Sequence, residues 1–545
     1  MNLISKLLEK TPSIHFITFI IILSSFYALV LNYPIISLFY DLAVDSNLFL
    51  AFSGPFLLFF CFLIIFSLIS IPYIFKPFLV FLTIGSSLAM YATLKYNVMF
   101  DNDMIENIFE TSTSEATRYL NTNVILYFIM TGIIPSLLII LVKIKPAKNI
   151  LTALSHRIIL IIIAIVGIGI IYITSFKGYS SIGRNNSYLN RMINPAYLYS
   201  SIKYLKNNYF KEKLTYIKIG EDVLLPPAKN DKPTLVILFL GETMRAQNSF
   251  YNGYARDTNP YTKEFDLLAF QNVASCGTAT AISVPCMFSN MPRESYNKDR
   301  ANAQDNVLDI LQRAGVSIRW KENNDGGKGV DKHIKALEIT DEEKGKHCAT
   351  GECFDSVLLD NLETFINQDD SNKLIGLHLL GSHGPTYYKR YPDEFRKFTP
   401  SCDTSDLVAC SDEEIVNVYD NTIVYTDYIL SESIRLLKKY SDEYNVAMMY
   451  LSDHGESLGE SGFYLHGSPY MIAPIEQRRI PWYLWMPDEY AQAKGIDKEC
   501  LTKKLKEETS GLSHDNFFHT LLGLYSVQTS AKDSKLDLIE SCRIK

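Results

Sequence analysis

The chain has 545 residues and a net charge of −7, and 48% of its residues are hydrophobic, so it is too long for one ordinary domain of about 150 residues. The acidic balance argues against a general nucleic-acid binder, because phosphate contacts need clustered Lys and Arg. Long apolar runs fill the first third, whereas most charged residues follow them. We therefore expect a membrane part followed by a water-soluble part.

Five runs in the first third are apolar and long enough to cross a bilayer as helices, which takes about 20 residues. A cleaved signal peptide is disfavoured, because no small-residue cleavage pattern follows the first run and more spans come after it. We expect residues 1–175 to form a transmembrane domain of five helices. The expected spans lie near Ile14–Leu31, Leu48–Ile71, Phe78–Leu94, Val124–Val142 and Ile158–Ile173.

Basic residues set the expected orientation, since short cytoplasmic loops carry an excess of Lys and Arg. An odd number of spans then puts everything after Ile173, and the acidic loop 97–123, on the far side of the membrane. In a bacterial inner membrane that side is the periplasm. The cations on which this orientation depends are Lys6, Lys10, Lys76, Lys143, Lys145, Lys148 and Arg157.

A segment rich in Tyr, Asn and Lys, residues 176–230, follows the last span. Aromatic and basic residues alternate in it, a mixture suited to a membrane interface. We expect a bridging helix on the bilayer surface and a linker. A solvated linker throughout is the alternative interpretation.

Eight of the nine cysteines lie in the soluble part, and Cys61 lies in an apolar span. Eight cysteines allow 105 pairings, so the sequence alone does not fix their connectivity. Disulfides persist in oxidising compartments such as the periplasm, and a zinc ribbon is disfavoured because no C-x-x-C pair occurs. Proximity along the chain favours the pairs Cys276–Cys286, Cys348–Cys353 and Cys402–Cys410, which leaves Cys500 with Cys542.

Short aliphatic runs after Pro227 indicate buried strands separated by helices. They are LVILFL (235–240), KLIGLHLL (373–380) and VAMMYL (446–451). Continuous apolar strands are typical of a mostly parallel sheet that helices cover on both faces. We therefore expect residues 231–545 to form an α/β catalytic domain, with ligands bound beyond the carboxyl ends of its strands.

Residue types that bind metals follow each of these strands. The motif GET supplies Glu242, GSHGP supplies His383, SDHGES supplies Asp453 and His454, and YLHG supplies His466. Zinc takes imidazole nitrogens and carboxylate oxygens, and catalytic sites leave one position open. A lone His at a strand end usually hydrogen-bonds a loop, but several at equivalent ends predict a metal site.

The stretch SCGTATAISVPCMFSN, residues 275–290, contains three hydroxyl residues between two cysteines: Thr278, Thr280 and Ser283. A free Thr hydroxyl is a weak nucleophile and no Ser-His-Asp arrangement is evident, so a metal is the plausible activator. If the stretch opens a helix, its free backbone amides attract a phosphate. On spacing alone the hydroxyls are equally compatible with helix caps.

Together, SCGTATAISVPCMFS, GET, GSHGP, SDHGESLGE and YLHG after five membrane spans resemble the bacterial lipid A phosphoethanolamine transferases, which include the mobile colistin-resistance enzymes. The resemblance covers almost the whole chain and implies an alkaline phosphatase/sulfatase-like fold. It implies that Thr280 is the nucleophile and that a zinc ion is held by Glu242, Thr280, Asp453 and His454. His383 and His466 match positions that hold a second zinc or contact phosphate, and the implied substrate contacts are His378, Asn324, Lys328, Asn107, Thr111 and Glu115.

The last three of these positions recur every four residues and would line one helix face toward the donor lipid. A solvated helix face is the alternative interpretation.

The resemblance also implies a ping-pong transfer from phosphatidylethanolamine to a phosphate of lipid A, which would confer polymyxin resistance because the added ammonium lowers negative charge. Both lipids lie in the membrane bilayer that anchors the chain, and we expect a monomer that binds no nucleic acid. Another acceptor is the nearest alternative: a core sugar, a periplasmic glucan or a polyglycerol phosphate. A catalytically inactive sensor is the alternative from another class, and a sulfatase is disfavoured because C-x-P-x-R is absent.

Overall fold

The computed structural model describes residues 13–44, 47–111, 113–210, 214–324, 326–349, 352–507 and 511–544. The chain forms two compact units: Met1–Ile105 with Leu120–Phe210, and Glu106–Tyr119 with Lys211–Lys545. The second unit therefore includes a short segment that the sequence places between two apolar helices. The predicted boundaries at 175 and 230 stay predictions, because compactness does not mark where the bilayer ends.

The first unit is built from apolar helices. Four of its described helices are long and apolar enough to span a membrane, and a bent pair supplies a fifth if it counts as one span. This agrees with the five predicted spans. The four are α4 (Leu48–Ile69), α5 (Phe75–Tyr96), the run Thr122–Leu141 that contains α8 (Thr122–Phe128) and α9 (Ile134–Leu141), and α10 (Ile150–Asn185).

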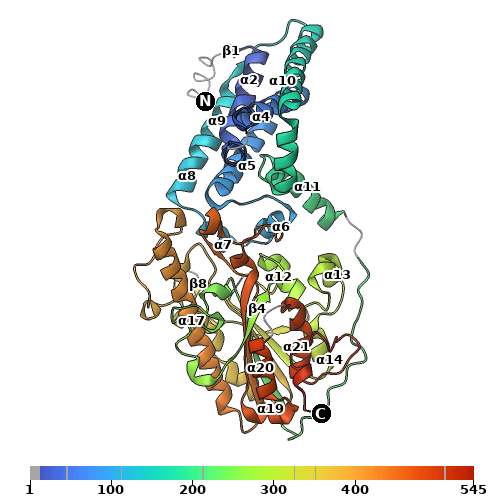
Figure 1. Ribbon diagram of the computed structural model, residues 1–545, viewed down its shortest axis with the longest axis vertical. Helices are drawn as coiled ribbons and strands as arrows, with labels where there is room; N and C mark the ends of the chain where they lie inside the picture. The colour runs from blue at the N-terminus through green and yellow to red at the C-terminus, as the bar shows by residue number, and fades with distance from the viewer. Residues whose placement is uncertain are drawn as a thin grey trace. The chain divides into compact units, whose positions relative to one another are not determined.

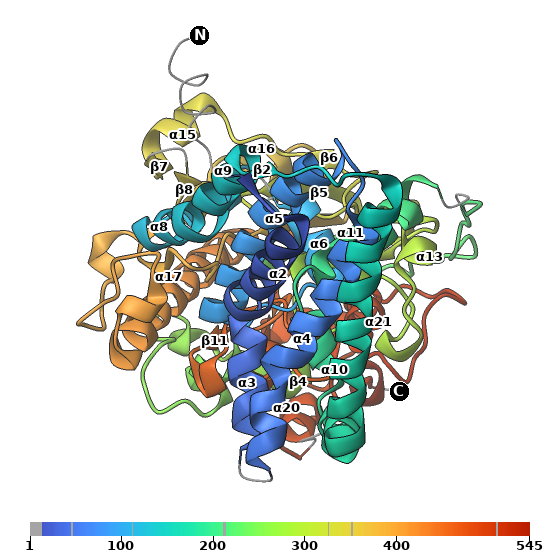
Figure 2. The same ribbon diagram turned by 90° about the horizontal axis from the view of Figure 1, so that it is seen from above.

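The first predicted span is bent rather than straight. Phe16–Leu31, which begins with α2 (Phe16–Phe26), meets α3 (Tyr33–Ala43) at 66°. Asn32 lies at the bend, where its amide donates to Tyr27 O at 2.9 Å and its carbonyl accepts from Asn194 N at 2.8 Å. These bonds satisfy the polar groups of the break inside an apolar helix bundle. Figure 2 shows α2, α3 and α10 beside α4, against which all three pack.

The last span is longer than predicted, because α10 continues beyond Ile173 to Asn185. The rest of the predicted bridging segment contains a second helix, α11 (Ala196–Tyr209). Its position at the bilayer surface stays a prediction.

The second unit contains a seven-stranded sheet in which β13 runs antiparallel to both of its neighbours, β10 and β4, while the other described pairings are parallel. The prediction of a mostly parallel sheet is confirmed. Strands β3, β9 and β10 are buried along their whole length. In spatial order the sheet is β4 (Leu268–Ala274), β13 (Arg479–Trp485), β10 (Asn445–Ser452), β3 (Thr234–Gly241), β9 (Lys373–His378), β5 (Ser317–Glu322) and β6 (Lys335–Ala336).

Helices cover both faces of this sheet. Figure 1 shows α17 (Asp412–Lys439) on one side and α14 (Val307–Arg313) with α21 (Phe517–Leu524) on the other. α17 begins with a reciprocal cap between Ser411 and Glu414, which satisfies backbone donors that a helix start leaves open. The remaining helices of this unit include α7 (Thr113–Arg118), α12 (Thr280–Met287), α13 (Lys298–Asn302), α15 (Asp341–His347), α16 (Leu362–Ile366), α18 (Ile475–Arg478), α19 (Asp488–Lys494) and α20 (Lys498–Glu507), and α6 (Asn102–Glu110) enters it at Glu106.

On one face the sheet packs a large apolar core against α14 and α21. Leu238, Trp482 and Phe517 are fully buried in it, and burying one such side chain contributes about 1.5–3 kcal/mol. Four short strands form two antiparallel pairs away from the sheet: β7 (Cys348–Ala349) with β8 (Glu352–Cys353), and β11 (Ser457–Leu458) with β12 (Tyr464–Leu465). In the first unit β1 (Ser13–Ile14) pairs with β2 (Lys143–Ile144).

The four predicted disulfides are all present. They join Cys276 to Cys286, Cys348 to Cys353, Cys402 to Cys410 and Cys500 to Cys542, and Cys61 of α4 is free.

The register of the central strands brings their carboxyl ends to one point. Leu240 of β3 pairs with Leu451 of β10 and with His378 of β9. The residues that follow these strands therefore meet at one edge of the sheet, where parallel sheets bind ligands.

Candidate active site

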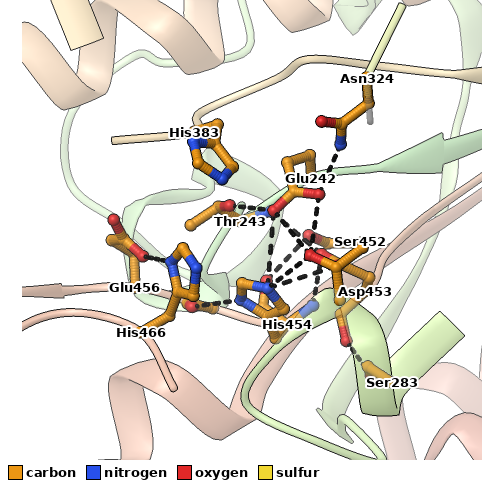
Figure 3. Close-up of polar contacts among 12 residues, drawn as sticks. Glu242, Thr243, Ser283, Asn324, His383, Ser452, Asp453, His454, Glu456 and His466 are labelled. Carbon is orange, nitrogen blue, oxygen red and sulfur yellow. Dashed lines mark hydrogen bonds and ion pairs between the residues drawn. The ribbon is translucent and has the colours of Figure 1, made fainter. Parts of the chain in front are cut away.

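Two carboxylates and one imidazole meet at this edge, as Figure 3 shows. Glu242 follows β3, while Asp453 and His454 follow β10, and all three side chains are buried. One ligand atom of each lies within 4.8 Å of the other two. The structure therefore brings together three of the four residues predicted to hold a metal.

The hydrogen bonds of this cluster leave three acceptors facing one another. Nδ1 of His454 lies 2.9 Å from Gly455 O, so Nδ1 carries the proton and Nε2 presents a lone pair. Nε2 faces Glu242 Oε1 at 3.5 Å and Asp453 Oδ2 at 3.3 Å. Asp453 Oδ2 is buried and has no hydrogen-bond partner among the described residues. A cation would satisfy all three groups, and this set of nitrogen and oxygen donors fits zinc.

Thr280 completes the cluster. It begins α12, and its Oγ lies 3.3 Å from Glu242 Oε2 and 3.4 Å from His454 Nε2. The other two hydroxyls are engaged elsewhere, since Thr278 donates to Ser468 O at 2.6 Å and Ser283 donates to the carbonyl of Asp453. Of the three hydroxyls, Thr280 is the one that faces the ligand cluster.

His383 and His466 flank this cluster. Nδ1 of His383 lies 2.8 Å from Gly384 O, and Nδ1 of His466 lies 2.8 Å from Glu456 Oε2. The ring of His466 lies 4.5 Å from that of His454 and 5.4 Å from that of His383, between centroids. In both residues the Nδ1 contact leaves Nε2 as the acceptor, which is the state that binds a metal or a donor group.

Asn324 and His378 also reach the cluster. The amide of Asn324 donates to Glu242 Oε2 at 2.7 Å and lies 3.3 Å from His378 Nε2. Nδ1 of His378 pairs with Glu322 Oε1 at 2.8 Å. Lys328 instead lines a neighbouring cavity of about 500 Å³ together with Pro285 of α12.

The predicted helix face of Asn107, Thr111 and Glu115 is wrong, because these residues do not share one helix. α6 ends at Glu110 and α7 begins at Thr113. The hydroxyl of Thr111 donates to the carbonyl of Asn107 at 2.7 Å, a bond that competes with regular helix geometry. The side chain of Glu115 lies outside the described residues, and the role of all three stays a prediction.

The pKa values of the two carboxyl groups shift in opposite directions. Burial opposes ionisation of Glu242, but His454, His383 and His466 outweigh it and lower its pKa to about 2. Burial and the charge of Glu242 raise the pKa of Asp453. Opposite shifts of this kind are expected when two acids share a buried site, because each negative charge opposes the ionisation of the other.

Comparison with known proteins decides the family. The chain is 38% identical to phosphoethanolamine transferase EptA of Escherichia coli K12 over 99% of both chains. The chain belongs to the phosphoethanolamine transferase family. Residues 58–209 match the family model for phosphoethanolamine transferase EptA/EptB, and residues 234–527 match the sulfatase model. The transferase is also 37% identical to phosphatidylethanolamine transferase Mcr-1 of E. coli, over 84% of this chain and 85% of that protein.

A solved structure agrees with the sequence comparison. The integral membrane protein lipooligosaccharide phosphoethanolamine transferase A from Neisseria meningitidis is 34% identical, and it matches with a TM-score of 0.92 over 98% of this chain and 100% of that one. The predicted fold is therefore confirmed: apolar helices followed by a sulfatase-like α/β domain. The transferase is a multi-pass protein of the bacterial inner membrane whose catalytic domain lies in the periplasm.

Sequence reasoning missed a buried histidine behind the transferase site. Nδ1 of His514 accepts from Cys276 N at 3.0 Å, and its Nε2 donates to Ser452 O at 2.9 Å. Burial lowers the pKa of His514 to about 3, so the ring is neutral. It links the corner that carries Thr280 to the end of β10. No strand-end motif surrounds His514, so the sequence offered no signal for it.

An arginine pair near His383 was missed as well. Arg118 Nε lies 2.7 Å from Glu352 Oε1, and Arg390 Nη1 lies 3.0 Å from Glu352 Oε2. Nη1 of Arg118 is 3.4 Å from His383 Nδ1. A residue of α7, from the segment between α5 and α8 in the sequence, thus contributes to the surroundings of the catalytic cluster. Such contacts have no periodicity by which a sequence could reveal them.

Proposed function

We propose that this transferase moves phosphoethanolamine from phosphatidylethanolamine to a phosphate of lipid A through a covalent ester on Thr280. The observation that carries the proposal is the position of Thr280 Oγ, which faces Glu242 and His454 while the neighbouring hydroxyls of Thr278 and Ser283 are engaged. Family membership supports the reaction class, because the relatives at 37–38% identity are phosphoethanolamine or phosphatidylethanolamine transferases.

In the first half-reaction Thr280 Oγ attacks the phosphorus of phosphatidylethanolamine. The new P–Oγ bond forms as the bond from phosphorus to the glycerol oxygen breaks, and diacylglycerol leaves. The proton that Thr280 loses balances the one that diacylglycerol gains. Glu242 is placed to accept the hydroxyl proton in a hydrogen bond, because its carboxylate is ionised and 3.3 Å away.

In the second half-reaction a phosphate oxygen of lipid A attacks the same phosphorus. The P–Oγ bond breaks, and Thr280 Oγ takes up the proton that the attacking phosphate hydroxyl loses. The product is lipid A with a diphosphate-linked ethanolamine, and the enzyme returns to its starting state. Splitting the transfer in two lets both lipids use one site in turn.

Glu242, Thr280, Asp453 and His454 would hold a zinc ion, for which the unpartnered Asp453 Oδ2 is the supporting observation. When bound, zinc supplies positive charge that favours the ionised Thr280 oxygen and offsets charge on the phosphoryl oxygens. The open backbone amides at the start of α12 add donors for those oxygens.

The outer residues would orient the transferred group. His383 and His466 present Nε2 toward the cluster and would hold a second zinc or the phosphate. Asn324 donates to the carboxylate of Glu242, and His378 contacts Asn324. Both would contact the phosphoethanolamine, and Lys328 would add positive charge. Asn107, Thr111 and Glu115 would contact the donor lipid.

The membrane helices support lipid substrates, since tethering the domain raises the effective concentration of lipids in the same bilayer. All site residues come from one chain, so a monomer suffices. Adding an ammonium group to a lipid A phosphate lowers the negative charge that polymyxin cations bind, and resistance would follow.

Mass spectrometry of lipid A from cells that express the protein tests this proposal. We expect lipid A to gain one phosphoethanolamine group per modified phosphate, and none with Thr280→Ala. If lipid A stays unmodified and a core sugar or glucan gains phosphoethanolamine instead, the proposed acceptor is wrong and that glycan is the acceptor. Polymyxin susceptibility of the same two strains tests the consequence for resistance.

A further inference from the structure

The membrane unit contains a large cavity far from the catalytic residues in the sequence. Its volume is about 1180 Å³, which exceeds the roughly 300–1,000 Å³ of most small-molecule sites. It lies where several helices begin or end: the end of α4 at Ser70, the start of α5 at Phe75, the end of α9 at Ile140 and the start of α10 at Ile150. The positive-inside rule assigns these helix ends to the cytoplasmic face.

The walls of this cavity are apolar along most of their length. Phe16, Ile71, Val80 and Ile144 line it, with Phe75 at the start of α5. Tyr73, in the turn between α4 and α5, is 97% exposed, and aromatic residues of this kind lie at membrane interfaces. Such walls suit acyl chains and do not suit a free inorganic anion.

Three cations and one histidine gather at this cavity without carboxylates. Lys76, Lys145, His156 and Arg157 line it, and within the described part of the chain no Asp or Glu does. No ion pair joins the side chains of Lys145 or His156 to a described carboxylate. The cavity therefore combines apolar walls with positive charge that no carboxylate of the described residues offsets.

Two of these cations hold helix ends. Lys76 Nζ donates to Ile140 O at 3.1 Å and to Val142 O, and Arg157 Nη2 donates to Ser70 O at 2.6 Å. These carbonyls carry only the partial negative charge of a helix end. Two full positive charges thus stay beside apolar surface, where an anionic group would stabilise them.

We propose that this cavity binds one anionic phospholipid of the cytoplasmic leaflet, with its phosphate among Lys76, Lys145, His156 and Arg157 and its acyl chains along the apolar walls. Basic pockets between membrane helices on the cytoplasmic side bind anionic head groups by this combination. A zwitterionic phosphatidylethanolamine fits less well, because its ammonium group would meet the same cations. This site is separate from the proposed donor and acceptor sites, which lie on the periplasmic side.

Native mass spectrometry of the full-length protein in detergent tests the proposal. The delipidated protein is titrated in parallel with phosphatidylglycerol and with phosphatidylethanolamine of the same acyl chains. We expect phosphatidylglycerol to bind about tenfold more tightly, with one lipid at the strong site. Equal affinity for the two lipids would overturn the proposal.

The double variant Lys145→Gln with His156→Gln tests the location. Both side chains line the cavity, and neither is among the side chains that hydrogen-bond the carbonyls at the helix ends, so we expect the variant to fold. We expect its affinity for phosphatidylglycerol to fall about tenfold. The matched control is Lys203→Gln with Lys206→Gln, which removes exposed cations of α11. Wild-type affinity in the first variant, or an equal loss in the control, would overturn the assignment. A melting temperature within about a degree of wild type verifies that both variants are folded.

Discussion

Arg118 and Glu352 stand 234 positions apart in the sequence, yet Arg118 Nε lies 2.7 Å from Glu352 Oε1. Arg118 lies near the end of the segment Glu106–Tyr119, which belongs to the catalytic unit. Lys298 anchors the start of the same segment, through ion pairs with Glu106 at 2.9 Å and Glu110 at 3.1 Å. The segment is therefore fixed to the catalytic unit at both ends.

Arg118→Ala should slow phosphoethanolamine transfer about tenfold or more. The guanidinium is 7% exposed, and its loss leaves Glu352 with Arg390 alone and removes a neighbour of His383. A missing partner of a buried charge typically costs about 1–3 kcal/mol. Transfer rates and melting temperatures of full-length variants measure the effect, and Arg118→Lys should recover part of the rate. Wild-type rates in Arg118→Ala would contradict this role.

Thr280→Ala should abolish transfer and leave the melting temperature unchanged, because it removes the proposed nucleophile and little packing. Thr278→Ala is the matched control: it loses the hydrogen bond to Ser468 O, which costs about 1 kcal/mol, but keeps most activity. Intact-protein mass after incubation with phosphatidylethanolamine alone should show one adduct, mapped to Thr280. An adduct on Thr278 or Ser283 would refute the assignment.

Asp453→Asn should remove both the bound metal and transfer, since it withdraws a ligand and leaves Glu242 and His454 without their cation. A chelator should lower the melting temperature of the wild type but not that of the variant. Elemental analysis checks the metal, with Glu489→Gln, an exposed acid of α19, as the control. Full turnover by a preparation free of divalent metal would exclude the mechanism.

Acid should destabilise the catalytic domain through His519 of α21. Burial lowers the pKa of His519 to about 4, and its Nδ1 accepts from Asp533 N at 3.0 Å. The neutral ring therefore contributes stability that is fully present above pH 6.5 and is lost as pH falls through about 4, up to about 3 kcal/mol.

Denaturant unfolding between pH 7 and 4 measures this effect, and His519→Gln should flatten the dependence. Burial raises the pKa of Asp420 and Asp427 to about 6, so these two acids also make stability depend on pH. Their contribution is the same in wild type and variant, so the difference between the two proteins reports His519. An unchanged dependence in the variant would contradict the role of His519.

Removing Cys276 and Cys286 together should reduce transfer more than stability. This disulfide crosses the corner that carries Thr280, and a misplacement of about 1 Å there costs roughly a hundredfold in rate. The backbone of Cys276 keeps its bonds to His514 and Arg293, so unfolding should be limited. The control is the double variant that removes Cys348 and Cys353, whose disulfide closes a shorter loop. Equal transfer rates in the two double variants would show that the corner needs no disulfide.

The sequence predicted the central cluster because of a simple geometric rule. Glu242, Asp453 and His454 follow apolar strands, and parallel strands bring their carboxyl ends to one edge. The neighbouring cysteines paired locally for an equally simple reason, since short loops close readily.

The residues around the central cluster could not be predicted, because they depend on tertiary contacts that no local sequence pattern encodes. His514 reaches Ser452 across 62 positions, and Arg118 meets Glu352 only once the domain has folded. The helix expected through Asn107, Thr111 and Glu115 failed for a local reason. A run of Thr and Ser between Glu110 and Glu115 offers side-chain hydrogen bonds that compete with the helix.

The segment Glu106–Tyr119 also imposes an order on biogenesis. At about 5–20 residues per second, a ribosome makes the 234 positions between Arg118 and Glu352 in roughly 10–50 s. During that time the segment has been translocated, but Glu352, the residue that Arg118 contacts, has not yet been synthesised. We expect it to stay protease-sensitive in nascent chains that stop before Glu352 and to become protected in chains that have passed Arg390. Docking of this segment would then be a late step of maturation, after translocation of the chain as far as Arg390.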